Sequence, residues 1–68
     1  MSETTSWTVT GMTCGHCVAS VTEELLEIDG VEAVDVDLAT GAVNVTSAGP
    51  IERDVVAAAV DEAGYALA

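Results

Sequence analysis

The chain has 68 residues, half of them hydrophobic, with Trp7 and Tyr65 as its two aromatic side chains. A single domain of this size has a small aliphatic core, which argues against a deep, water-free enzyme pocket. Twelve acidic residues against one arginine, Arg53, give a formal net charge of −11. This charge excludes binding to nucleic acid and to anionic lipid, because almost nothing in the chain can neutralise phosphate groups.

The sequence predicts a cytoplasmic protein. No apolar run reaches the ~20 residues of a membrane span, so we expect no direct membrane insertion. Residues 1–5 lack the basic and apolar segments of a signal peptide. We interpret the acidity as a halophilic adaptation, since acids near the C-terminal ends of both predicted helices oppose the helix dipole unless salt screens them. A surface for a basic partner is the alternative.

The spacing of hydrophobic residues predicts the secondary structure of the first half of the chain. Residues 6–10 alternate as a strand, with Trp7 and Val9 on one face. A glycine-containing loop follows, and a helix is expected from Cys17 to Ile28, ended by Gly30. The apolar stripe of this helix consists of Val18, Val21, Leu25 and Ile28. The residues expected to face water are Ser20, Glu23, Glu24 and Glu27.

The second half begins with a hairpin. Residues 31–38 alternate as a strand, with Val34, Val36 and Leu38 on one face, and a turn at 39–41 leads to a strand around Val43 and Val45. A second helix is expected to open at Gly49–Pro50, with Pro50 in its first turn. Its apolar face is predicted to hold Val55, Val56, Ala59, Val60 and Ala63. Residues 65–67 form a short last strand.

The order strand, helix, strand, strand, helix, strand predicts a single α+β domain over residues 1–68. The simplest packing is a ferredoxin-like βαββαβ sandwich, a four-stranded antiparallel sheet with two helices on one face. Right-handed crossovers place the first and third strands together in the centre.

Both cysteines fall in the segment Cys14–Cys17, where several interpretations compete. A structural disulfide would close a very small loop and stabilise the fold little. Dithiol redox exchange suits this spacing near a helix start, although thioredoxin-type proteins support such a motif with a larger sheet. A closed zinc site needs four ligands, and the chain offers two cysteines and His16. A weak zinc site completed by a carboxylate or a second molecule remains open.

The remaining interpretation is an open two-thiolate site for a soft monovalent ion. Cu(I) favours thiolates and accepts low coordination numbers. The first turn of a helix supplies N–H groups and a positive dipole end, which stabilise thiolate charge. An under-coordinated ion on a loop is also open to attack by a thiolate of another protein, so this site favours transfer over storage.

Residues 11–17, from Gly11 to Cys17, closely resemble the metal-binding loop of the heavy-metal-associated domain. The resemblance covers essentially the whole chain and includes residues 29–31, the Gly41 turn and residues 63–65. It implies soft-metal handling, because free-standing members of the family resemble cytosolic copper chaperones. Those chaperones carry Cu(I) to matching domains of copper-transporting P-type ATPases.

The resemblance also implies residue roles. Cys14 and Cys17 match the two metal ligands, and Met12 matches a methionine that packs beneath the loop. Tyr65 matches a position near the metal, where it shields the site, donates an O–H to a thiolate, or simply fills an edge of the core. His16 is interpreted as a solvent-exposed residue, with a third ligand as the alternative.

We therefore expect a Cu(I) metallochaperone that is not an enzyme and passes copper by thiolate exchange to a P-type ATPase domain. Zn, Cd, Hg and Ag are the alternative metals, and the apo protein is expected to be a monomer, with a copper-bridged dimer as the alternative state. The short chain starting at Met1 favours a stand-alone carrier. A copper buffer or sensor, an excised ATPase domain and a dithiol redox protein are the alternative functions. With Arg53 alone the chain presents no basic face, so its partner needs a basic or neutral surface.

Overall fold

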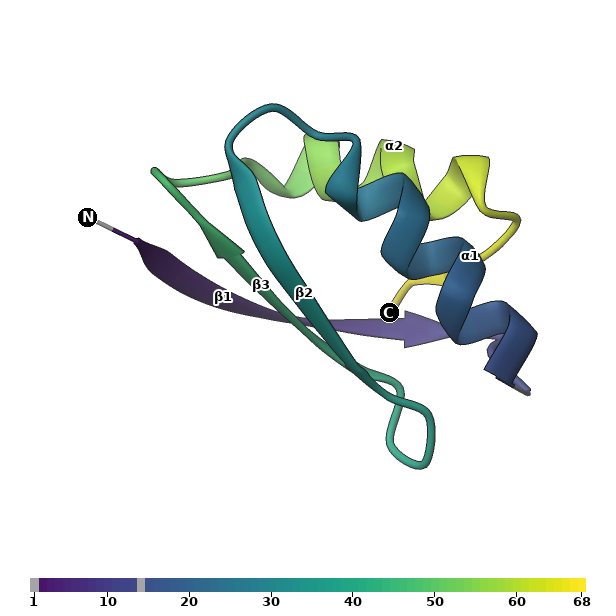
Figure 1. Cartoon of the computed structure of the whole chain (residues 1–68). Helices are drawn as coiled ribbons and strands as arrows, with labels where there is room; N and C mark the ends of the chain where they lie inside the picture. Colours follow the sequence, from purple (N-terminus) through teal and green to yellow (C-terminus); the bar gives the residue numbers. More distant parts are fainter. Residues whose placement is uncertain (1, 14) are drawn as a thin grey trace.

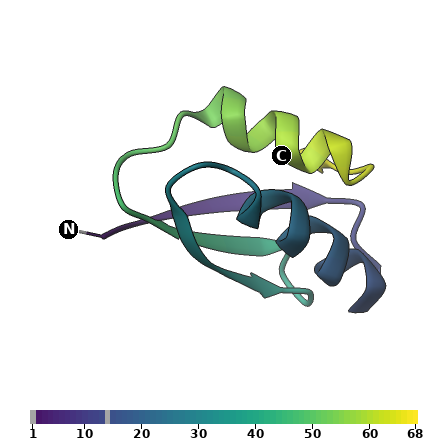
Figure 2. The same ribbon diagram turned by 45° about the horizontal axis from the view of Figure 1, so that its top comes forward.

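The described residues form two helices and four strands, in the order strand, helix, strand, strand, helix, strand. A computed structural model describes residues 2–13 and 15–68. The elements are β1 (Glu3–Thr10), α1 (Gly15–Leu26), β2 (Val31–Asp37), β3 (Ala42–Ser47), α2 (Arg53–Glu62) and β4 (Ala66–Leu67). Both helices lie over one face of the sheet (Figures 1 and 2). The predicted ferredoxin-like fold is confirmed.

The sheet is antiparallel throughout, with the strand order β2-β3-β1-β4. The first and third strands are central, as right-handed crossovers predict. β4 is short: it pairs with β1 only through Val9↔Leu67 and Thr10↔Ala66. The next backbone N–H, that of Ala68, donates to the carbonyl oxygen of Thr8 at 2.8 Å and extends this pairing.

The core lies between the central strands and the two helices. Alternate residues of β1 and β3 point inward, and each helix contributes residues spaced three or four apart, so the two periodicities meet in one cluster. Its members are Val9, Val21, Leu25, Val43, Val45, Val56, Ala59 and Val60. All are aliphatic, as the composition predicts, and each fully buried valine or leucine contributes about 2 kcal/mol by leaving water.

The last residue of the turn between β2 and β3, Gly41, continues the pairing of β3 with β1. Gly41 has a φ of +77°, and its carbonyl oxygen accepts a hydrogen bond from the Val9 N–H at 2.9 Å. A Cβ atom built on Gly41 would lie 2.6 Å from the Val9 carbonyl oxygen. Real Cβ atoms do not approach backbone oxygen so closely, so both the conformation and the space at this position require glycine.

The prediction that the second helix opens at Gly49–Pro50 is wrong, because α2 begins at Arg53. Glu52 precedes it in an extended conformation, with φ −75° and ψ 147°. The chain must first cross from the sheet to the helical layer, and Ile51 packs against the core on the way. Ser47, buried at the end of β3, holds the start of this connection by donating to the carbonyl oxygen of Gly49.

Three smaller expectations also differ from the structure. α1 spans Gly15–Leu26 and not 17–28, because the loop enters the helix earlier and the chain leaves it in a tight turn before Gly30. Leu38 lies in the hairpin turn and is 39% exposed. Val55 is 41% exposed, since a rotation of about 100° per residue carries it away from the face centred on Val56 and Val60.

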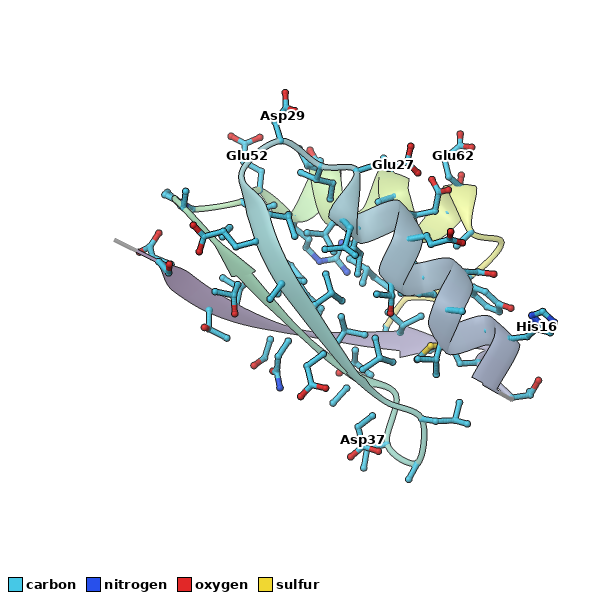
Figure 3. The ribbon with its side chains drawn as sticks, in the orientation of Figure 1. His16, Glu27, Asp29, Asp37, Glu52 and Glu62 are labelled. Carbon is cyan, nitrogen blue, oxygen red and sulfur yellow. The ribbon has the colours of Figure 1, made fainter. Side chains whose placement is uncertain are left out.

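Acidic side chains gather where α1 packs beside α2. Partial burial raises the pKa of Glu24 above its ordinary value of 4.5, and the charges of Glu27, Glu62 and Glu23 raise it further. Figure 3 shows the labelled Glu27, just after the end of α1, and Glu62, the last residue of α2, projecting from the helical layer. Glu24 was expected to face water, but it is half-buried. The repulsion is therefore built into the helix–helix contact.

We expect the substitution Glu24→Gln to raise the melting temperature at neutral pH. A pKa raised by folding means that the folded state binds the proton more tightly than the unfolded state. This preference stabilises the fold below the ordinary pKa and is lost as the pH rises through the raised pKa. The gain from Glu24→Gln should therefore disappear at acidic pH in thermal melts. Glu3→Gln, the same change on exposed β1, is the control, and an equal gain there would contradict the explanation.

Candidate metal centre

A short loop joins the end of β1 to the start of α1 at one end of the sheet (Figure 1). Gly11 has a φ of +91°, which turns the chain out of the strand. Met12 follows and packs against the hydrophobic core while remaining partly exposed. The loop is thus attached to the core by an apolar side chain two residues before the cysteine segment.

Cys17 lies in the first turn of α1. Its side chain is largely buried, with 7% of the residue exposed. The sulfur lies 3.8 Å from the Thr13 hydroxyl oxygen, within the range of a hydrogen bond in which either atom can be the donor. Residues 15–18, the first helical turn, include no acidic residue. The helix N–H groups and the positive dipole end therefore favour a thiolate at this position.

The other predicted ligand, Cys14, lies outside the described residues. His16 stands on the first turn of α1 and is exposed, and Figure 3 shows its imidazole projecting away from the body of the domain. Within residues 2–13 and 15–68, no three His, Cys, Asp or Glu side chains come together as a metal-binding group.

Tyr65 reaches the loop from the opposite end of the sequence. It follows Gly64, whose φ is +93°, and its N–H donates to the Val60 carbonyl oxygen at 3.1 Å. The half-buried ring packs against the core and lies beside Gly11, where an added Cβ atom would be 3.3 Å from Cδ1 of the ring. The structure therefore brings Met12 and Tyr65 together around one loop.

The contact between Thr13 and Cys17 was missed by the sequence analysis. A signal existed, because Thr13 is a hydroxyl residue just before a helix start, where such side chains commonly turn toward the first helical turn. Its partner here is a sulfur atom four residues along the chain.

The model of the heavy-metal-associated domain family matches residues 7–66, nearly the whole chain. The chain belongs to the heavy-metal-associated domain family. A curated relative, the copper chaperone CopZ of Bacillus subtilis, is 41% identical over 61 residues, and the match covers 88% of each chain.

Solved structures of the same family superpose closely. A structure described as the CopZ metallochaperone matches with a TM-score of 0.89 and 33% identity, covering 97% of this chain and all of that one. A copper-binding domain of HMA7, a P-type ATPase, matches with a TM-score of 0.86 and 27% identity, covering 96% and 89%. The described part of this heavy-metal-associated domain has no helix that is long and apolar enough to cross a membrane.

The contact between Gly11 and Tyr65 leads to a paired prediction. Gly11 and Gly30 both have a φ of +91°, but a Cβ atom would meet Tyr65 only at Gly11 and nothing within 4 Å at Gly30. Alanine at either position should cost about 1–2 kcal/mol of unfolding free energy through backbone strain alone. Only Gly11→Ala should also shift the ring resonances of Tyr65 in NMR spectra. Equal ring shifts in both variants would show that the contact is unimportant.

Proposed function

We propose that this heavy-metal-associated domain is a Cu(I) metallochaperone and not an enzyme. The observation that carries the proposal is the place of Cys17, in the first turn of α1 on a loop anchored by Met12. In the proposed site the thiolates of Cys14 and Cys17 hold one Cu(I) ion as cargo. The resulting unit carries one negative charge, which suits a helix N-terminus. Two thiolates without a cage of nitrogen or oxygen ligands favour Cu(I) over harder ions.

Transfer in this proposal is ligand exchange. A thiolate of the acceptor attacks the under-coordinated copper, a three-coordinate intermediate forms, and either Cys14 or Cys17 then leaves. The acceptor that we propose is a metal-binding domain of a copper-transporting P-type ATPase reached from the cytoplasm. Support comes from the close match with the HMA7 domain, because two domains of one fold can present their metal loops to each other.

Two neighbouring side chains are proposed to support the site without binding metal. Met12 holds the loop against the core, and the Tyr65 ring shields the loop from the side of Gly11. His16 projects into solvent and is proposed to leave the affinity unchanged.

An anaerobic Cu(I) titration against a competing chelator tests the site. We expect one copper per wild-type chain and a large loss of affinity in Cys14→Ser and in Cys17→Ser, because a single thiolate cannot hold a two-coordinate ion. His16→Ala is the matched control on the same loop–helix junction and should bind as the wild type does.

Further measurements distinguish the chaperone from the competing functions. Passage of copper to an ATPase domain on mixing supports a chaperone, whereas retention with a copper-dependent doubling of size indicates a buffer or sensor. Turnover of a disulfide substrate would indicate a redox protein. Unchanged copper affinity in Cys14→Ser would refute the site.

We also propose that the acidic surface is an adaptation to high salt. The mutual repulsion around Glu24 supports this, because it destabilises the fold most when it is unscreened. At ~1 M salt the Debye length falls to about 3 Å, and most of this repulsion vanishes. The melting temperature should therefore rise as KCl is added up to ~1 M. A melt that is independent of KCl would contradict the proposal.

A further inference from the structure

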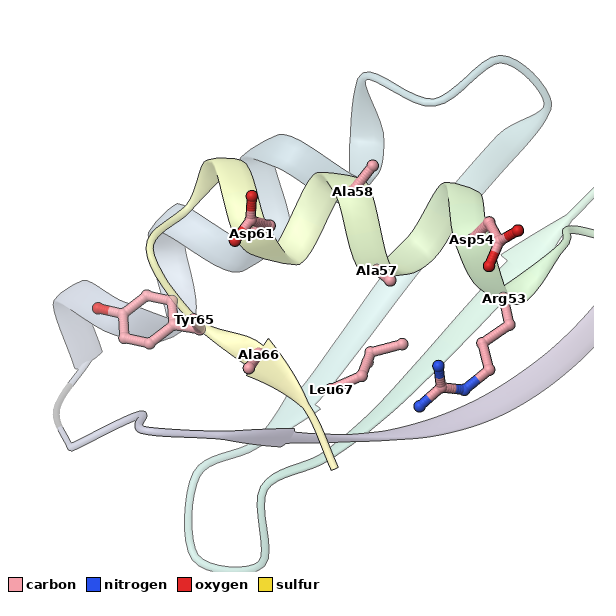
Figure 4. A pocket seen from close by; sticks show the side chains of 8 residues that line it. All are labelled: Arg53, Asp54, Ala57, Ala58, Asp61, Tyr65, Ala66 and Leu67. Carbon is pink, nitrogen blue, oxygen red and sulfur yellow. The ribbon is translucent and has the colours of Figure 1, made fainter.

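A groove runs between α2 and the edge of the sheet. It has a volume of about 450 Å³. Figure 4 shows Asp54 and Asp61 toward its two ends, with Ala57 between them. The groove is lined by Arg53, Asp54, Ala57, Ala58, Asp61, Tyr65, Ala66 and Leu67. The small alanine side chains leave space between the two carboxylates, which stand two helical turns, about 10 Å, apart.

The lower wall of the groove is a strand edge. β4 is the outermost strand, so no further strand within the described residues flanks it on this side. The Ala68 N–H bonds to β1, and hydrogen-bonding directions alternate along an antiparallel strand. The backbone N–H and carbonyl of Leu67 therefore point away from β1. An extended segment laid along β4 can pair with them, in the manner of β-strand addition.

Charge selects the occupant. The chain carries a net charge of −11, and two of its carboxylates line this groove. The sequence contains one arginine and no lysine. This arginine, Arg53, donates a hydrogen bond to the carbonyl oxygen of Ala68 at 3.2 Å. An acidic segment would be repelled, whereas basic side chains on alternate residues of a strand lie about 7 Å apart and can extend toward both aspartates.

We propose that this groove binds an extended segment of a partner protein that carries arginine or lysine on alternate residues. Its backbone pairs with Leu67, and its cationic side chains lie between Asp54 and Asp61 under α2. The Tyr65 ring forms part of the groove wall and also lies beside Gly11. A partner seated here is therefore held next to the metal loop. Only this last role rests on the proposed function; the binding itself does not.

The test uses the reduced, metal-free, ¹⁵N-labelled full chain and the peptide acetyl-Val-Arg-Val-Arg-Val-amide at low salt. We expect saturable shifts of the amide resonances around Ala57, Asp61 and Leu67, with slower hydrogen exchange at the Leu67 amide. The same peptide with citrulline in place of arginine keeps the shape and hydrogen-bonding groups but loses the charge, and it should not saturate.

Two double variants distinguish binding in the groove from general attraction of the peptide to the negative net charge of the protein. Asp54→Asn with Asp61→Asn should weaken peptide binding roughly fivefold, which is the scale of two exposed ion pairs. Glu3→Gln with Asp35→Asn removes the same charge from exposed positions outside the groove and should change binding less than twofold. Equal weakening in both pairs, shifts centred on Glu24 and Glu27, or no saturable binding would overturn the proposal. Cu(I) affinity, measured alongside, should be unchanged in both pairs and so tests the metal site separately.

Discussion

The proposed metal loop depends on how the C-terminal end of β1 is held. Hydrogen bonds secure this end on both sides: Gly41 accepts from the Val9 N–H on one side, and Thr10 pairs with Ala66 on the other. Val9 itself is buried in the core. The chain therefore leaves the sheet from a fixed point, and Met12 fixes it again one residue after Gly11. Cys17, in the first turn of α1, gains a defined position in this way.

The distribution of acidic residues complements this arrangement. The carboxylates that repel one another most clearly lie around Glu24, in the C-terminal half of α1, whereas the first turn of that helix carries none. Negative charge thus opposes the dipole at the end where no chemistry is proposed and is absent from the turn that holds Cys17. The surface carries its high net charge without placing an acid in the turn where a thiolate is proposed to form.

Much of the fold follows from local patterns, and the differences arise where packing decides. Alternation and helical spacing predict the order of the elements and the two central strands. Proline at position 50 suits a helix start, yet the crossing from β3 to the helical layer uses it in the connection. Leu38 continues the alternation of β2 in sequence but lies beyond the last paired residue. A pattern of hydrophobic residues does not predict how far apart two elements lie, so it cannot predict how many residues their connection needs.

The candidate site was also predictable only in part, because some of its features are local in the sequence and others are not. The cysteine spacing and the following helix are local features, but the approach of Tyr65 to Gly11 joins residues near opposite ends of the chain. No periodicity encodes such a contact. The groove beneath α2 also depends on where a two-residue strand lies, and the sequence shows only that such a strand can exist.

The fit of Gly41 against Val9 has a consequence for engineering the domain. Exposed hairpin tips are usually the first choice for grafting labels, epitopes or permuted termini. Here Gly41, where the turn enters β3, also braces the strand that leads into the loop, so residues added at this position would disturb a site far away in sequence.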